Sequence, residues 1–308
     1  MSENIDLGEL RSSDFHRKEA DALRILSEAF ASQPDPAAAS AELVRSIREY
    51  CSKYESSAIA ETNLFYFWMM ILNAQRIIPM DHPWHEALIA AVDDLRRQGG
   101  PLVGNDTESL WEDLPGLHVV VLDFWADPTN FPDTVPEEIE IWKRWNSLVS
   151  GFVARGCRSY RGFAYWEIRD ALENDSHDEP TLFDATTVFE CKLWVATQWL
   201  IRCGGILFDD LTHGEEIEEE SKSWGCGPLC RDIPTYSIQR WDFWMSRLVQ
   251  LADKKSTIRM KEGTPHDVVL SESSLSRVDQ AIAAMHKYRS IAEARDQLGG
   301  HKHINSTG

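Results

Sequence analysis

The spacing of apolar residues predicts helices along nearly all of this 308-residue chain. In an α-helix, residues three or four positions apart share a face, so apolar side chains at that spacing mark a helix with one buried side. Phe15, Leu23, Leu26 and Phe30 follow this pattern, and the stretch QPDP then ends the helix. The same criteria predict helices at about residues 14–32, 36–58, 61–78, 84–98, 106–113, 117–126, 136–154, 160–173, 182–208, 237–252 and 274–294.

Two of these helices are expected to be buried. Residues 61–78 are apolar around most of the helix circumference, and residues 182–208 carry large apolar side chains in several directions. The alternation of apolar and polar positions that marks strands is absent, and so is an internal repeat. The sequence therefore predicts an all-α protein, with a bundle-like single domain over residues 1–298, a buried central helix pair and a disordered tail at 299–308.

Charge and composition narrow the classes of partner. Fifty acidic against thirty-one basic residues give a net charge of −19, which repels nucleic acid and anionic membranes and is most simply explained by solubility. The longest apolar run, LFYFWMMIL, has nine residues, whereas a membrane span needs about 20. Six scattered Cys and an N-terminal segment without the features of a signal peptide favour reduced thiols and a cytoplasmic location.

Motifs for metals and nucleotides are incomplete or missing. Cys226 and Cys230 are separated by three residues, and His82 and His85 by two, but neither pair has a second pair at zinc-site spacing. The sequence lacks His-Glu-x-x-His, a phosphate-binding loop and a dinucleotide fingerprint. NDTESLWED and DDLTH partly resemble the magnesium motifs of class I terpene cyclases. However, Asp113 stands where the first motif has Glu, His213 stands where the second has an acid, and the order of the two motifs is reversed. We expect no metal and no cofactor.

Candidate catalytic groups lie next to aromatic residues. Glu112 and Asp113 follow Trp111, and a dry aromatic setting would raise the pKa of a carboxyl group there; a helix cap or a solvated acid is the simpler alternative. Arg155 and Arg169 could donate hydrogen bonds to a ligand carbonyl in an apolar cavity.

For Arg169 an ordinary surface pair with Glu173, four residues later, is the competing interpretation. The twelve Trp residues predict a thick aromatic core, a pocket with flat walls, or both. We expect Trp145, Trp166 and Trp199 to form the walls of a substrate cavity, and Trp111 and Phe152 to contribute to substrate binding. Packing in the core is the alternative for each Trp.

Five phrases of the sequence, in order, resemble a known family. They are SLWEDLPGL, WNSLVSGFVARG, YWEIRDALE, WVATQWLIRCGGILFD and YSIQRWDFWMSRL, within about residues 60–250. The chain is similar to a helical family of unknown function from filamentous fungi, often encoded beside genes for secondary-metabolite biosynthesis. The resemblance carries over no catalytic residue and no cofactor. It implies a cytosolic fungal protein that acts on a hydrophobic terpenoid or polyketide intermediate.

These observations favour cofactor-independent cyclisation, such as an intramolecular Diels–Alder reaction. An apolar cavity can hold a reactive substrate in a folded conformation, and one positioned donor can polarise a carbonyl. One alternative is a non-catalytic binding or accessory protein with Trp-rich surfaces for partners. Another is an acid–base isomerase or dehydratase, which needs Glu112, Asp113 or another acid inside the cavity.

Overall fold

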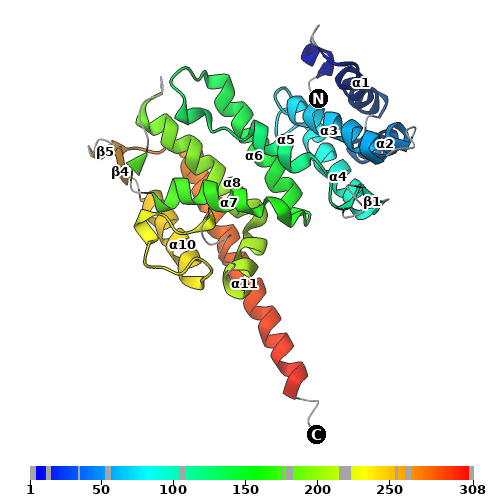
Figure 1. Ribbon diagram of the computed structural model, residues 1–308. Helices are drawn as coiled ribbons and strands as arrows, with labels where there is room; N and C mark the ends of the chain where they lie inside the picture. The colour runs from blue at the N-terminus through cyan, green and yellow to red at the C-terminus, as the bar shows by residue number, and fades with distance from the viewer. Residues whose placement is uncertain are drawn as a thin grey trace. The chain divides into compact units, whose positions relative to one another are not determined.

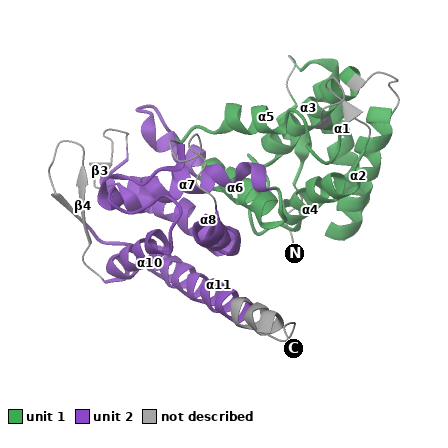
Figure 2. Cartoon of the chain, turned by 60° about the horizontal axis from the view of Figure 1, so that its bottom comes forward, with its two compact units in different colours: residues 1–127, 140–157 green, residues 128–139, 158–308 purple. Residues whose placement is uncertain are grey.

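The structure, a computed structural model, confirms the all-α class (Figure 1). It describes residues 5–11, 15–33, 35–52, 57–100, 102–103, 108–174, 176–177, 183–214, 223–253, 256–260 and 265–304. The chain divides into two compact units, residues 1–127 with 140–157 and residues 128–139 with 158–308, coloured separately in Figure 2. Among the described residues, the helices are all too short or too polar to cross a bilayer.

Unit 1 is built from the N-terminal helices. They are α1 (Arg17–Ser32), α2 (Pro36–Ser52), α3 (Ser57–Ala74), α4 (Pro83–Arg97), α5 (Leu117–Phe124) and most of α6 (Pro136–Ala154). As predicted, α3 is buried, and Phe67 and Trp68 are fully inaccessible to solvent. His82 caps α4 by accepting a hydrogen bond from the backbone N–H of Trp84, 3.3 Å away, and Pro83 occupies the first helical position.

Unit 2 is organised around α8 (Ala185–His213), which is buried as expected. The other elements are α7 (Arg161–Ile168), its π-helical continuation η4 (Arg169–Glu173), α10 (Ile238–Ala252) and α11 (Glu272–Ile304). α11 packs along α8 at Gly204 and Gly205, where an added Cβ would lie 2.7 and 3.1 Å from the Tyr288 ring. These glycines therefore permit close helix packing, and the Tyr288 hydroxyl donates to the carbonyl of Ile201 at 3.0 Å.

The helix predicted at residues 106–113 is wrong over its described part. Residues 106 and 107 lie outside the described residues, strand β2 (Glu108–Ser109) pairs with β1 (Leu102–Val103), and residues 110–113 form turns. The Asp113 carboxylate accepts the backbone N–H of Ser109 at 2.6 Å. Asp side chains that bond nearby backbone in this way compete with helix formation, and Pro115 prevents continuation of a helix.

A small sheet lies outside the predicted helices, although the sequence shows no strand pattern there. β4 (Ser256–Met260) pairs antiparallel with β5 (Pro265–Val268) and parallel with β3 (Ser176–His177). At the C-terminus, α11 continues to Ile304, and residues 305–308 of the expected tail lie outside the described residues. The single domain and the disordered tail stay predictions.

Candidate functional site

A buried carboxylate lies at the end of the π-helical turn η4 in unit 2. A π turn inserts one extra residue into the helix and is frequent at functional sites. Here it ends at Glu173, whose side chain is fully buried. The carboxylate accepts four hydrogen bonds: from Arg240 Nε (2.7 Å) and Nη2 (3.1 Å), from Trp244 Nε1 (2.5 Å) and from the backbone N–H of Gly227 (2.7 Å).

Arg240, on α10, is the counter-ion of this carboxylate and is also fully buried. Its Nη1 donates to the carbonyls of Trp224 (2.7 Å) and Thr235 (3.3 Å), and its guanidinium lies 5.3 Å from the ring centroids of Tyr165 and Trp244. Burial alone would lower the pKa of Arg240, but the hydrogen bonds and charge of Glu173 outweigh burial and raise it. Arg240 is therefore a charged group enclosed by matched acceptors and aromatic faces.

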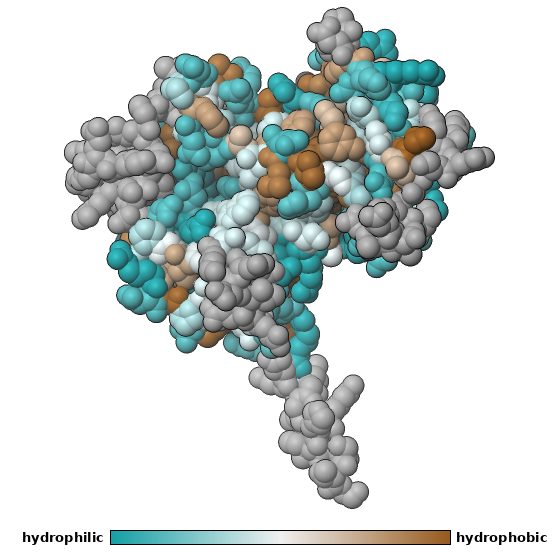
Figure 3. All heavy atoms as spheres, in the orientation of Figure 1, coloured by the Kyte–Doolittle hydropathy of each residue, from teal (hydrophilic) through white to brown (hydrophobic). Residues whose placement is uncertain are grey.

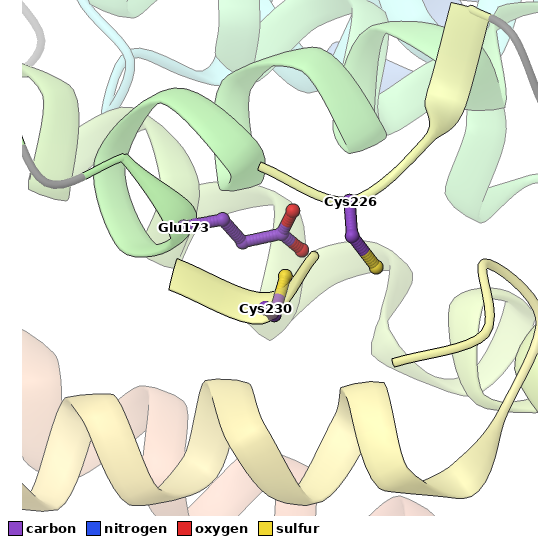
Figure 4. Close-up of side chains that lie close together, drawn as sticks. All are labelled: Glu173, Cys226 and Cys230. Atoms are coloured by element: carbon purple, nitrogen blue, oxygen red, sulfur yellow. The ribbon is translucent and has the colours of Figure 1, made fainter. Parts of the chain in front are cut away.

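Cys226 and Cys230 lie beside this ion pair (Figure 4). Their sulfur atoms and a Glu173 oxygen are all within 4.8 Å of one another. Cys226 is half-buried and Cys230 is buried. A hydrogen bond from Cys230 lowers the pKa of Cys226 despite burial, helped by the positive charge of Arg240, and the same bond raises the pKa of Cys230.

The set Glu173, Cys226 and Cys230 makes a poor metal site. The Glu173 carboxylate is already bonded by four N–H groups, and Arg240 places a positive charge against it. Only two thiols then remain, whereas structural zinc takes four ligands. The arrangement suits thiol chemistry better than metal coordination.

An open groove lies in the same unit between α8, α10 and α11. Its volume is about 440 Å³, within the range of small-molecule sites. The apolar lining consists of Phe208, Ile238 and Ala292. The polar lining consists of Thr212, His213, Asp242, Arg289 and Glu293. This mixture fits a compact ligand with an apolar body and a polar edge.

Of the predicted site residues in unit 2, Trp166 and Arg169 are brought together. The Trp166 indole and Arg169 Nη1 both donate to the carbonyl of Ser223, at 3.0 and 3.2 Å, and Arg169 also donates to Gly225 at 3.3 Å. These bonds fix the segment that carries Cys226. Trp199 is fully buried in α8.

The aromatic site residues predicted in unit 1 are packed against protein. Trp111 is buried, with the Arg48 guanidinium 5.4 Å from its ring centroid. Trp145 donates its indole N–H to the carbonyl of Leu72 at 2.9 Å, and Phe152 is 1 % exposed.

The predicted charged residues of unit 1 lie at the surface. Glu112, Asp113 and Arg155 are exposed, and Arg155 lies 3.6 Å from Glu86. The expected cavity would need Trp145 from unit 1 together with Trp166 and Trp199 from unit 2. That cavity, with Arg155 or Arg169 at one end, stays a prediction.

Unit 1 contains a further polar constellation that the sequence did not indicate. The His85 ring lies 2.6 Å from Gln75 Oε1 through Nδ1 and 3.0 Å from Ser147 Oγ through Nε2. The order resembles a hydrolase triad, but the three residues are 0 to 2 % exposed. A nucleophile needs access to its substrate, so we assign this network to packing of α4 against its neighbours.

The distribution of Trp side chains bears on the choice between a ligand pocket and a docking surface. Each of the twelve Trp residues lies in the described part of the chain and is buried or half-buried. Figure 3 shows several patches of apolar residues on one face, and among the described residues the exposed large apolar side chains are aliphatic except for Phe131. Among the described residues, the Trp side chains therefore pack within the protein rather than form an exposed aromatic patch.

Glu173, Arg240 and the groove residues were missed from the sequence. Two signals existed: the Cys-x-x-x-Cys pair, and the four-residue spacing of Arg240 and Trp244 on one helix face. Comparison with protein families matches residues 68–248 to the model of a protein of unknown function, DUF3632. Comparisons with curated proteins and with solved structures found no match.

Proposed function

The chain belongs to the DUF3632 family of proteins of unknown function, and we propose that it binds and converts a small organic molecule without a cofactor, in the groove of unit 2. The observation that carries this proposal is the groove itself, with about 440 Å³ between α8, α10 and α11. Phe208, Ile238 and Ala292 offer an apolar surface, and ionisable side chains surround it. Such a site binds the body of a ligand by burial and orients its polar edge by hydrogen bonds.

The reaction that we propose is cyclisation of a terpenoid or polyketide intermediate in fungal secondary metabolism, in the cytoplasm. The apolar surface would hold a flexible substrate in a folded conformation and so lower the entropic part of the barrier. Arg289 would polarise a substrate carbonyl. Its guanidinium has five N–H donors, and the bond to Asp242 engages Nη2. This proposal concerns the groove, and the cavity predicted between Trp145, Trp166 and Trp199 stays a separate prediction.

A second candidate, an acid–base isomerase or dehydratase, is supported by three side chains of the groove. His213, Asp242 and Glu293 all line it, so a base and an acid could face one substrate. His213 Nδ1 lies 2.8 Å from Thr212 Oγ1, which leaves Nε2 directed away from this contact. Binding without conversion would instead support the non-catalytic alternative.

The test compares two neutral substitutions to Trp at exposed positions. Thr212→Trp places an indole in the groove, whereas Val249→Trp adds the same surface on α10 outside the groove lining. The metabolite that accumulates in cells lacking the gene is incubated with each purified protein. We expect conversion by the wild type and by Val249→Trp, and at least about tenfold slower conversion by Thr212→Trp, equivalent to 1.4 kcal/mol of lost binding.

The mechanism is resolved by the same assay in D₂O. Cyclisation leaves carbon-bound hydrogens of the product unlabelled, whereas acid–base isomerisation introduces deuterium and is slowed by His213→Gln. Equal conversion by the two Trp variants would refute the groove as the site. Equal product with and without protein would refute catalysis altogether.

A further inference from the structure

We propose that Cys226 and Cys230 form a reversible disulfide in the folded chain, with Cys226 as the thiol that attacks first. This inference concerns a different site from the groove and does not depend on the proposed function. It assigns unit 2 a redox-active dithiol whose oxidant is a low-molecular-weight disulfide.

The geometry brings the two sulfur atoms close, and the Cys226 thiol also donates a hydrogen bond to the carbonyl of Ile233 at 3.4 Å. They lie within 4.8 Å of each other, and a disulfide requires an approach to about 2.05 Å. Cys226 precedes the short 3₁₀ helix η5 (Pro228–Cys230), and Cys230 ends it. A rotation of one side chain and a small adjustment of this short segment would therefore be enough.

The surroundings hold the segment in place while the sulfurs react. Trp166 and Arg169 bind the carbonyl of Ser223, and Arg240 binds the carbonyl of Trp224 at 2.7 Å. The Glu173 carboxylate holds the N–H of Gly227, between the two cysteines, at 2.7 Å. The buried ion pair of Glu173 and Arg240 thus holds the segment that carries both cysteines and positions their sulfur atoms in the reduced chain.

The two thiols differ in the way that thiol–disulfide exchange requires. Cys226 is half-buried and reachable, whereas Cys230 is 3 % exposed. The hydrogen bond from Cys230 and the charge of Arg240 lower the pKa of Cys226 and so favour its thiolate. The Cys230 thiol keeps its proton until the second step.

The reaction is balanced as follows. The Cys226 thiolate attacks one sulfur of a small disulfide, an S–S bond forms, and one small thiolate leaves. Cys230 then loses its proton and attacks the Cys226 sulfur, and the second small thiolate leaves. The protein loses two electrons and two protons, and the small disulfide gains both as two thiols.

The alternative occupant of the two sulfurs is a soft metal ion. It is disfavoured because four N–H groups already bond the two oxygens of the Glu173 carboxylate. Arg240 also repels a cation at this position. Zn²⁺ binding is therefore measured as well, to distinguish a metal site from a disulfide.

The first experiment measures thiol reactivity in the full-length, reduced chain. Iodoacetamide labelling at pH 8, followed by peptide mass spectrometry, compares Cys226 with Cys157, which is also half-buried and has its pKa raised to about 11 by burial. The pKa of Cys226 lies below its ordinary value, so Cys226 has the larger thiolate fraction at pH 8, which its lower intrinsic nucleophilicity offsets only in part. We expect Cys226 to react at least about tenfold faster.

The second experiment equilibrates the chain with mixtures of reduced and oxidised glutathione. We expect a Cys226–Cys230 disulfide that forms and is reversed by dithiothreitol. Cys230→Ser should accumulate glutathione on Cys226, and Cys226→Ser should leave Cys230 unmodified. Cys157→Ser, the control, should leave the disulfide unchanged.

Three results would overturn the proposal. One is that Cys226 and Cys230 stay reduced in the wild-type chain in glutathione mixtures that oxidise an unstructured peptide with the same Cys-x-x-x-Cys spacing. Another is a Cys226 labelling rate equal to that of Cys157. The third is stoichiometric Zn²⁺ binding that protects both cysteines from iodoacetamide and is lost in Cys226→Ser. The wild-type measurements decide the question even if a variant fails to fold.

Discussion

Replacing Glu173 with Gln should destabilise unit 2 more than any comparable loss of a surface charge. The substitution keeps the size of the side chain but removes its charge, so Arg240 becomes a fully buried cation without a counter-ion. It also replaces one acceptor oxygen by an NH₂ group, which then faces N–H donors that hydrogen-bond to the carboxylate in the wild-type chain.

The magnitude follows from these contacts. The carboxylate accepts four N–H bonds, and the amide oxygen of Gln can keep about two of them. Hydrogen bonds to a charged group contribute about 1.5–3 kcal/mol each, so two lost bonds predict about 3–6 kcal/mol. Removal of one partner from a buried ion pair costs about 3–5 kcal/mol, which agrees with this range. We therefore expect a loss of about 4 kcal/mol.

The assay is native-state hydrogen exchange, since a chain with two units need not unfold in a two-state manner. Amides of α8 and α10 report the opening of unit 2, and amides of α1 and α2 report the opening of unit 1, which contains the control. The matched control is Glu28→Gln, which breaks the exposed pair with Arg24 and should change stability by less than about 0.5 kcal/mol. Adding Arg240→Met to Glu173→Gln should recover about 1–3 kcal/mol, because the unpaired charge is removed. A Glu173→Gln effect no larger than that of Glu28→Gln would refute the reasoning.

Three further substitutions test other contacts. Burial raises the pKa of Cys51 from 9.0 to about 12. Between pH 9 and pH 12 the unfolded thiol therefore loses its proton while the native thiol keeps it, so the free energy of unfolding should fall as the pH rises through this range. Cys51→Ala should flatten that fall by about 1.4 kcal/mol per pH unit in urea unfolding above pH 9, and an unchanged slope would contradict the assignment. Gly227→Ala places a Cβ 2.7 Å from the backbone carbonyl oxygen of Glu173. The stability of unit 2, measured by hydrogen exchange, should fall by about 1–3 kcal/mol, and an unchanged stability would show that the segment relaxes freely. Trp68→Phe removes the hydrogen bond from the buried Trp68 indole to the Pro115 carbonyl (3.0 Å). The free energy of unfolding in urea should fall by about 2–4 kcal/mol, and a change below about 0.5 kcal/mol would show that another contact replaces this bond.

The helices could be predicted because their signals are local. Apolar spacing predicts helices at residues 84–98 and 136–154. The structure has α4 at Pro83–Arg97 and α6 at Pro136–Ala154. Element ends are also local, as at Asp184, whose carboxylate accepts the N–H of Thr187 (2.9 Å) and caps α8. Strand β3 was missed because it pairs across about 80 residues of chain with β4. The β4–β5 pair is local, but its short strands lack the clean alternation of apolar and polar residues that marks a strand.

The candidate site could be predicted only in part. Cys226 and Cys230 were identified from spacing, and Trp166 and Arg169 from their aromatic setting. Glu173 was interpreted as a surface partner of Arg169, because a regular helix places residues four apart side by side. Its real partner, Arg240, is 67 residues away, and nothing in a single sequence reports a contact of that separation.

The residues of the phrase LWEDLPG, within the region that matches the family, are explained by local folding. Trp111 packs against Gly100, where an added Cβ would lie 2.0 Å from the ring, and Asp113 closes the turn onto Ser109. Gly116 adopts a φ of +80°, a conformation that favours glycine, at the start of α5.

In the same phrase, Leu114 has a φ of +49° and is only 2 % exposed, so burial of its side chain offsets an unfavourable backbone conformation. Pro115 supplies the carbonyl that the Trp68 indole binds. Each of these residues has a conformational or packing reason to be where it is. The phrase LWEDLPG is therefore explained by the folding of one turn. Chemistry is better sought where folding does not require the residue, as in the polar lining of the groove at His213 and Glu293.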